Sequence, residues 1–453
     1  MATAITGIER STAAAPIRRP GPRARRRFAV ASATFALFLW LVLIGTAPMQ
    51  EWAGQTSNST GDALNQVLYV GIMLVLLVGS GMISRRELFC IPAALVVLLA
   101  FCLLSVSWAV APLIALRRIV QTTIVVWIIF RQVNDLGPTR TLRMLRVAMV
   151  ALLIINYLVV FFTPYGIHGE VFGEASSVVG DWRGIIPHKN ITGAACSLTI
   201  LLFLFDNRQF SRIVSALVIL GAAVFLFYTN SRTSEVILVL AVALGFAIRP
   251  YSASYRSTMV IILLVFAGIA LQAVSANIRF LADTFNDPGA LTGRGAIWPL
   301  LFEYAGEHPW TGAGFGSFWQ IGDASPIWTL TSGWVAIYAP HGHNGFLDLL
   351  VTIGVPGLLL AIAALAVWPL LRLLLSLSID KSRRSLLLAL MAFCLGHNLT
   401  ESSLLSGAAV VEVFLILTIA LIYRESDASA GAHQLLRRRM ARLVRRSRPR
   451  MVR

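Results

Sequence analysis

The sequence predicts an all-α integral membrane protein of about twelve transmembrane helices, each close to the length that crosses a bilayer. Hydrophobic residues make up 57% of the 453-residue chain and charged residues only 13%, whereas soluble domains carry about a quarter charged residues. Mean hydropathy is +0.76. Apolar runs of roughly 20 residues, the length that spans the hydrocarbon core, recur along the whole chain. Together these observations indicate a chain that is solvated mainly by lipid.

The apolar runs give the expected order of the helices. They cover residues 28–46, 66–83, 88–108, 112–130, 142–163, 191–206, 211–229, 233–248, 257–275, 344–370, 385–400 and 407–423. Around 344–376 the pattern does not distinguish one long helix from two short ones. The chain therefore divides into a basic tail (1–27), nine helices (28–275), a long loop (276–343), three more helices (344–423) and a second basic tail (424–453).

The distribution of positive charge predicts the orientation. Most of the 38 Lys and Arg residues, which give a formal net charge of +17, lie in the two tails and in every second connecting segment. Such segments stay on the cytoplasmic side of a membrane. Both termini are therefore expected in the cytoplasm and the loop 276–343 outside it. The tails suit anionic lipid headgroups, and nucleic-acid binding is not predicted.

Five cations fall on the outer side against this bias: Arg183, Lys189, Arg232, Arg279 and Arg294. Arg294 follows a glycine where the chain turns into a predicted helix, and a helix start with a guanidinium group suits an anion. A solvated loop arginine would show the same pattern. Arg232 lies at the membrane edge, where it would face either lipid headgroups or a polar cavity.

A second polar cluster precedes the sixth predicted helix and contains Arg183, His188, Lys189 and Asn190. Two cations and a histidine within so few residues suit a doubly charged phosphate group, which binds through charge-assisted hydrogen bonds. A structural role is the alternative.

Two histidines, His341 and His343, stand where the long loop returns to the membrane. A His-x-His pair could bind a metal ion, but no cysteine and no further histidine lies at ligand spacing, so no metal site is predicted. A neutral imidazole can instead take a proton from a hydroxyl group. Asn344 and Asp348 are expected to orient the ring.

His397 and Glu401 are four residues apart near the outer end of the eleventh predicted helix, and therefore lie on the same face. No role follows for them from the sequence. The other outer-face residues combine several cations with a candidate base beside a lipid phase. This combination predicts an anionic, lipid-linked substrate with a diphosphate leaving group.

The motifs in this part of the chain resemble those of the bacterial O-antigen ligase and Wzy-type polymerase superfamily, in particular its exopolysaccharide-production polymerase branch. The resemblance rests on the order and spacing of five segments: Trp182–Asn190, Asn230–Thr233, Thr292–Trp298, Pro309–Ser317 and His343–Leu350. The matching motifs lie within residues 180–360, and the expected arrangement of helices resembles the family along the whole chain.

The resemblance implies a glycosyltransferase of the GT-C type in a bacterial inner membrane, with undecaprenyl-diphosphate-linked glycan as donor and no metal or other cofactor. By motif position, Arg232, Arg294 and His343 would be catalytic, with Arg232 and Arg294 holding the diphosphate. Arg183 and Lys189 would be further donor contacts, and reaction would invert the anomeric centre. His341 competes with His343 for the role of base.

The first function that we predict is polymerisation of lipid-linked repeat units, in which a second glycan is the acceptor. Chain-length regulators and flippases are further candidate partners. A ligase that moves a finished glycan onto a lipid or protein needs the same residues. A transporter or flippase of lipid-linked sugar is the alternative from another class. Against it stand the absence of two related halves and the scarcity of ionisable groups near mid-membrane.

Overall fold

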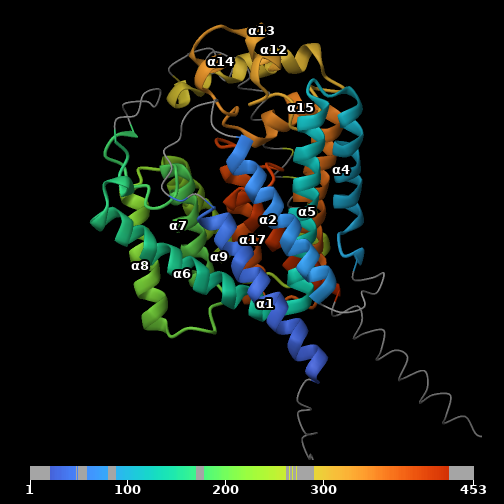
Figure 1. The fold of residues 1–453 in the computed structure, drawn as a ribbon. Coiled ribbons are helices and arrows are strands. Elements are labelled where there is room, and N and C mark those ends of the chain that lie inside the picture. Colours follow the sequence, from blue (N-terminus) through green and yellow to red (C-terminus); the bar gives the residue numbers. More distant parts are fainter. Residues whose placement is uncertain are drawn as a thin grey trace, which may run out of the picture.

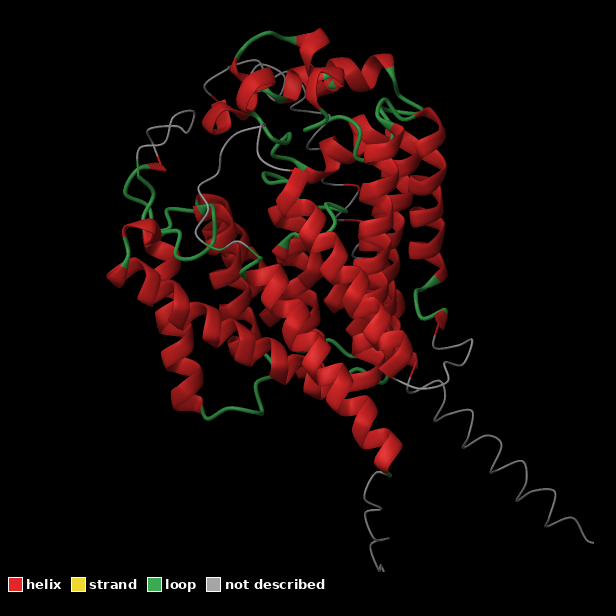
Figure 2. Cartoon of the chain, in the orientation of Figure 1, coloured by secondary structure: helices red, strands yellow, loops and turns green. Residues whose placement is uncertain are grey.

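The structure of the protein is a computed structural model that describes residues 21–46, 59–79, 88–169, 178–261 and 290–427, with single positions at 48, 265, 268 and 272. Within these ranges all regular structure is helical, and the only extended pairing is an isolated bridge between Ile167 and Trp182. Figure 2 shows the helices gathered into one bundle. The structure therefore confirms the predicted fold class, an all-α membrane protein.

Among the described residues, four helical segments are long and apolar enough to cross a membrane: Arg25–Leu43 within α1 (Pro22–Leu43), α5 (Pro112–Leu136), α6 (Pro138–Phe162) and Gly345–Leu375. Shorter apolar helices are α2 (Ser59–Gly79), α4 (Ala93–Leu104) with its 3-10 extension Ser105–Trp108, α7 (Lys189–Leu204) and α8 (Arg212–Tyr228). Further helices are α9 (Arg232–Ala247), α17 (Lys381–His397) and residues 410–427. They follow the predicted order. Most of the predicted span 257–275 lies outside the described residues, so the total of about twelve remains a prediction.

The long run after residue 344 is helical to residue 375 but is interrupted by a kink at Gly354. It consists of α15 (Gly345–Ile362), a π-helical turn (Ala363–Val367) and α16 (Trp368–Leu375). Gly354 breaks α15 with φ 65° and ψ −176°, and Pro356 follows within the helix. The amide freed by the break is used, because Val355 N–H donates to Pro309 O at 2.8 Å. A Cβ at Gly354 would lie 2.6 Å from backbone atoms of Trp310, so only glycine fits this contact.

The segment 290–344 covers one end of the bundle, called the loop end below (Figure 1). It contains a 3-10 turn (Ala290–Ala296), α12 (Trp298–Glu307), a second 3-10 turn (Gly322–Ala324), α13 (Ile327–Leu330) and α14 (Trp334–Tyr338). The segment has its own hydrophobic core, which includes Trp298, Phe318 and Trp319. These aromatic residues therefore pack inside the loop.

Arg118, a charged residue inside α5, fastens this segment to the bundle. Its guanidinium group donates to the carbonyl oxygens of Gly316, Trp319 and Gln320, the last two at 2.9 and 3.2 Å. The hydrogen bonds compensate a charge placed within an apolar helix, because the three carbonyl oxygens belong to residues outside any helix and are free to accept. The loop segment is thus held in a defined position over the bundle.

Candidate active site

The turn His341–Asn344 is built by short local hydrogen bonds. His343 has a left-handed backbone with φ 50°, and its N–H donates to His341 Nδ1 at 3.2 Å. Gly342 N–H donates to Asp348 Oδ1 at 3.0 Å, and Asn344 Oδ1 accepts from the first amides of α15. Asn344 and Asp348 were predicted to orient the imidazole ring. In the structure both side chains accept hydrogen bonds from the backbone of the turn and its helix, so an effect on the ring through the turn stays a prediction.

The turn is joined to the segment that follows α17. Gly345 N–H donates to the carbonyl oxygens of Asn398 and Glu401 at 2.9 and 3.0 Å, and Asn344 N–H donates to Ser402 Oγ at 3.0 Å. These bonds satisfy amides at the start of α15 that have no partner inside the helix. They place Glu401 beside His343.

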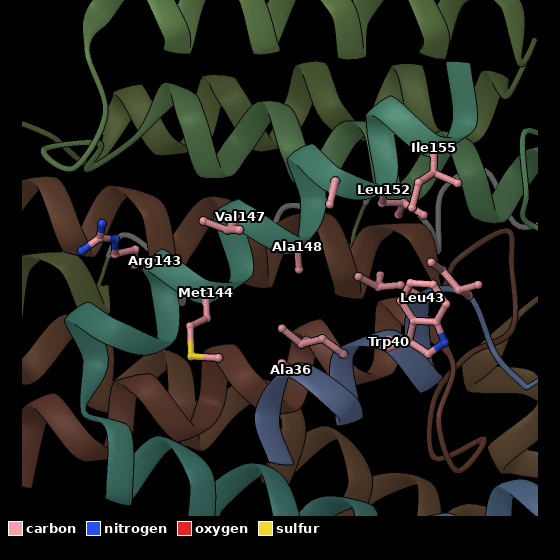
Figure 3. A pocket seen from close by; sticks show the side chains of 12 residues that line it. Ala36, Trp40, Leu43, Arg143, Met144, Val147, Ala148, Leu152 and Ile155 are labelled. Atoms are coloured by element: carbon pink, nitrogen blue, oxygen red, sulfur yellow. The ribbon is translucent and has the colours of Figure 1, made fainter. Parts of the chain in front are cut away.

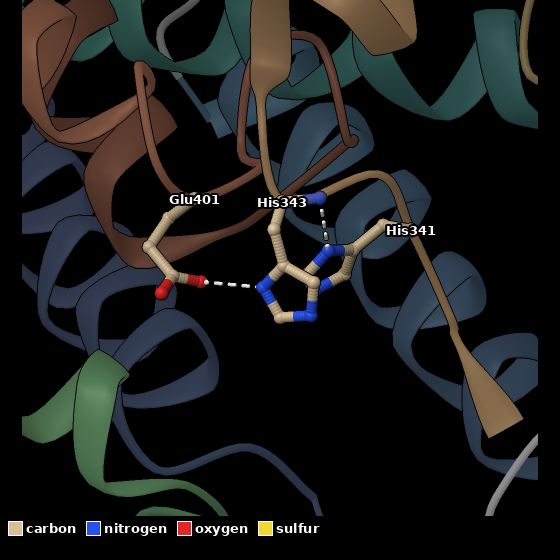
Figure 4. A group of neighbouring side chains, drawn as sticks. All are labelled: His341, His343 and Glu401. Atoms are coloured by element: carbon tan, nitrogen blue, oxygen red, sulfur yellow. Dashed lines mark hydrogen bonds and ion pairs between the residues drawn. The ribbon is translucent and has the colours of Figure 1, made fainter. Parts of the chain in front are cut away.

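Glu401 is the centre of the site. Its Oε1 accepts from Arg294 Nη2 and from Asn190 Nδ2, both at 2.8 Å, and its Oε2 lies 3.3 Å from His343 Nδ1. Figure 4 shows the His343 ring directed toward this carboxylate, with His341 on the other side. The carboxylate therefore joins three chain segments that the sequence analysis had singled out separately. The sequence placed Glu401 at the outer end of a helix, near these cations, but gave it no role.

Arg294 is not a solvated loop residue. Its side chain is 13% exposed, and Nε and Nη2 both donate to Thr400 O at 2.9 and 2.7 Å. It lies in the 3-10 turn before α12, after Gly293 with φ 87°. The bidentate hold on one carbonyl fixes the planar guanidinium group next to Glu401.

The electrostatic environment keeps the carboxylate charged and two histidines neutral. Burial raises the pKa of Glu401, but the hydrogen bond from His343 and the charges of His343, His397 and Arg294 outweigh it, so this pKa lies below its usual range. Burial, together with neighbouring positive charge, lowers the pKa of His341 to about 3. Burial likewise lowers the pKa of His188 to about 4. Near pH 7 His341 is thus a neutral ring, with Nδ1 occupied as an acceptor and Nε2 left as a donor.

His341, His343 and Glu401 bring donor atoms within 4.8 Å of one another, a spacing that a metal ion could bridge. Two contacts oppose such a site. His343 N–H already uses His341 Nδ1, and the cationic Arg294 lies 2.8 Å from Glu401. A guanidinium group at that distance neutralises the carboxylate and repels a metal ion. We therefore describe the cluster as an acid–base site.

Two cavities meet at His341. The first, the amphipathic cavity, has a volume of about 440 Å³ and a polar end formed by His188, Asn190, His341, His343, His397 and Glu401. Its remaining wall is mainly apolar and comes from Leu41–Gly45, Ile186, Pro187, Ile191 and 408–411. The second, the polar chamber, has a volume of about 330 Å³ and is lined by polar groups that include Gln66, Arg117, Gln121, Gln320, Ser402, Ser403 and Ser406.

The structure places Arg183 and Lys189 away from the amphipathic cavity. Arg183 is 2% exposed, donates from Nε to Tyr165 O at 2.8 Å and lies 4.0 Å above the Tyr165 ring. Lys189 forms an ion pair with Asp181. Neither residue is among those that line the described cavity. Direct contact with a donor phosphate, as predicted, would require both to leave these partners.

Arg232 begins α9 next to the site, but its side chain is 80% exposed and pairs with Glu235 at 3.2 Å. Its neighbour Thr233 shares a 2.9 Å hydrogen bond with Thr400. The backbone at Arg232 therefore lies close to the Glu401 cluster, whereas its guanidinium group is outside it. His188 and Asn190 do reach the cavity, and His188 also caps α7 by accepting from Asn190 N–H at 3.2 Å.

Residues 215–362 match the family described as O-antigen ligase. This match confirms the superfamily resemblance inferred from the motifs, without selecting the exopolysaccharide branch. No curated protein matches the chain. The matched residues include Arg232, Arg294 and His343, whereas Asn190 and Glu401 lie outside them.

Glu401→Gln tests whether this carboxylate positions the His343 ring. The amide keeps the size of the side chain and an oxygen for Arg294, but it removes the charge. Turnover is expected to fall about 100-fold, because the ring loses the partner that fixes its tautomer. Measuring kcat and KM separately checks this: kcat should fall while KM for the donor stays close to that of wild type. An unchanged kcat would contradict a positioning role for Glu401.

Proposed function

We propose that the protein is an inverting, metal-independent glycosyltransferase that polymerises undecaprenyl-diphosphate-linked repeat units. The observation that supports this most directly is the shared carboxylate: Glu401 lines the amphipathic cavity together with the candidate base His343 and also binds the cation Arg294, which lies behind this wall. A base and a cation set side by side suit a hydroxyl nucleophile and an anionic leaving group. The apolar wall suits a lipid-linked donor.

In the proposed reaction, His343 donates its Nδ1 proton to a hydrogen bond with Glu401, which leaves Nε2 as the acceptor. Nε2 takes the proton of the acceptor hydroxyl as its oxygen attacks the anomeric carbon of the donor sugar. The bond from that carbon to the diphosphate oxygen breaks, and its electrons leave with the diphosphate. Attack from the face opposite the leaving group inverts the anomeric centre.

Positive charge supports departure of the diphosphate. Arg294 and His343 both bind Glu401. Fixed guanidinium groups stabilise charge that develops on phosphate oxygens. The arriving diphosphate would compete with Glu401 for Arg294. Arg232 remains a candidate second contact because its exposed side chain starts beside the same cluster. In this proposal the loop end faces the extracytoplasmic side, and the acceptor glycan enters through the polar chamber.

A ligase that transfers a finished glycan is the second candidate, because the matched family is described as O-antigen ligase. Both reactions need the same base and the same leaving group, so the site geometry alone does not separate them.

The test uses a strain that lacks this gene, complemented with wild type or Arg294→Ala, and sizes its lipid-linked glycans and its surface polysaccharide. Single lipid-linked repeat units without long polymer are expected in the deletion and variant strains. Long polymer that stays on its carrier lipid would identify a ligase. Single units trapped on the cytoplasmic leaflet would identify a flippase and refute the enzyme proposal.

A further inference from the structure

An apolar groove with a volume of about 350 Å³ lies between α1 and α6, beside the amphipathic cavity (Figure 3). The groove exists because small residues stand where the two helices face each other: Ala36 on α1, and Ala148 and Ala151 on α6. Small side chains leave space between neighbouring helices that larger ones would fill. Its walls are otherwise apolar and mostly aliphatic, with Trp40 as the aromatic member and Arg143 at one end.

The groove and the amphipathic cavity adjoin. Leu43 and Ile44, at the end of α1, line both spaces. The same cavity carries His343 and Glu401 at its polar end. One elongated molecule could therefore place a polar head at the Glu401 cluster and an apolar chain between α1 and α6.

We propose that this groove binds the polyprenyl chain of the lipid-linked donor. The inference rests on the proposed function, which supplies a lipid whose reacting group belongs at His343. An ordinary phospholipid keeps its headgroup at the membrane surface and has no reacting group to place in the cavity. The wall that the groove shares with the amphipathic cavity thus favours the polyprenyl diphosphate as the occupant of the groove.

The length of the groove limits how much of the chain it holds. Residues 36–44 of α1 rise about 12 Å and residues 143–155 of α6 about 18 Å, so only the isoprene units nearest the diphosphate fit. The rest of the chain stays among lipid tails. Because lipid is itself apolar, the affinity that the groove contributes comes from van der Waals packing and not from the hydrophobic effect. The same packing holds the diphosphate end in a reactive orientation.

The test compares two probes that carry no sugar, undecaprenyl diphosphate and geranyl diphosphate, binding to the purified full-length chain in nanodiscs. Wild type is expected to bind the long-chain diphosphate about tenfold more tightly, a difference of about 1.4 kcal/mol. Ala151→Phe, which fills the groove from α6, should remove this preference, because it should weaken the binding of the long-chain diphosphate only. Ala36→Phe fills the same space from α1 and serves as a second variant if the first does not fold.

Ile154→Phe is the matched control, because Ile154 lies on the same helix, is 55% exposed and is not part of the groove lining. It should leave both affinities unchanged. An intact preference in the groove variants, or equal weakening of both diphosphates, would overturn the assignment. Loss of co-purified phospholipid without a change in diphosphate affinity would also overturn it, by identifying a bilayer lipid as the occupant. If neither diphosphate binds wild type, the proposed function itself fails and the groove assignment falls with it.

Discussion

Replacing His343 with alanine is expected to lower turnover about 10³-fold while donor binding is retained. A positioned general base contributes roughly 10²–10⁴-fold, and Glu401 holds this ring at 3.3 Å. The alanine removes the only proton acceptor assigned to the reaction but leaves Arg294 and the amphipathic cavity in place. Single-turnover rates, measured together with the affinity for undecaprenyl diphosphate, would check both parts of the expectation.

His341→Asn is the matched control for this experiment. Its Oδ1 can accept the N–H that His341 Nδ1 accepts now, which preserves the turn around His343. Since burial lowers the pKa of His341 to about 3, this ring is a poor proton acceptor, and its loss should reduce turnover by less than about tenfold. Retained turnover in His343→Ala with loss in His341→Asn would reverse the two roles.

Arg294→Ala is expected to abolish detectable polymer and to lower the turnover of purified protein about 10²–10³-fold. Two effects combine. The departing diphosphate loses its nearest fixed cation, and Glu401, 8% exposed, loses the guanidinium group that compensates its buried charge. Surface polysaccharide and the rate of diphosphate release would measure the effect, with membrane insertion monitored in parallel.

Two further variants separate these effects. Arg294→Lys keeps a positive charge but loses the bidentate hold on Thr400 O, so it should recover part of the activity. Arg212→Ala removes an exposed arginine at the start of α8 and should leave polymer unchanged. Normal polymer in Arg294→Ala would exclude this arginine from the reaction.

The sequence alone determined the membrane class, the order of most helices and the segments that carry the site. These features are local: a helix that crosses lipid must show a long apolar run, and motifs such as Thr292–Trp298 are read within a few residues. The resemblance to the O-antigen ligase superfamily rested on such motifs, and the match over 215–362 confirms it.

Only the tertiary structure decided which side chains meet. Glu401 binds Asn190 across 211 residues of sequence and Arg294 across 107, and no local pattern encodes such a pairing. Arg183 shares its motif with Asn190 but is buried against Tyr165, whereas Arg232 remains exposed. The physical reason is that helix periodicity fixes the face of one helix, while the packing of several helices and the loop over them fixes where those faces converge.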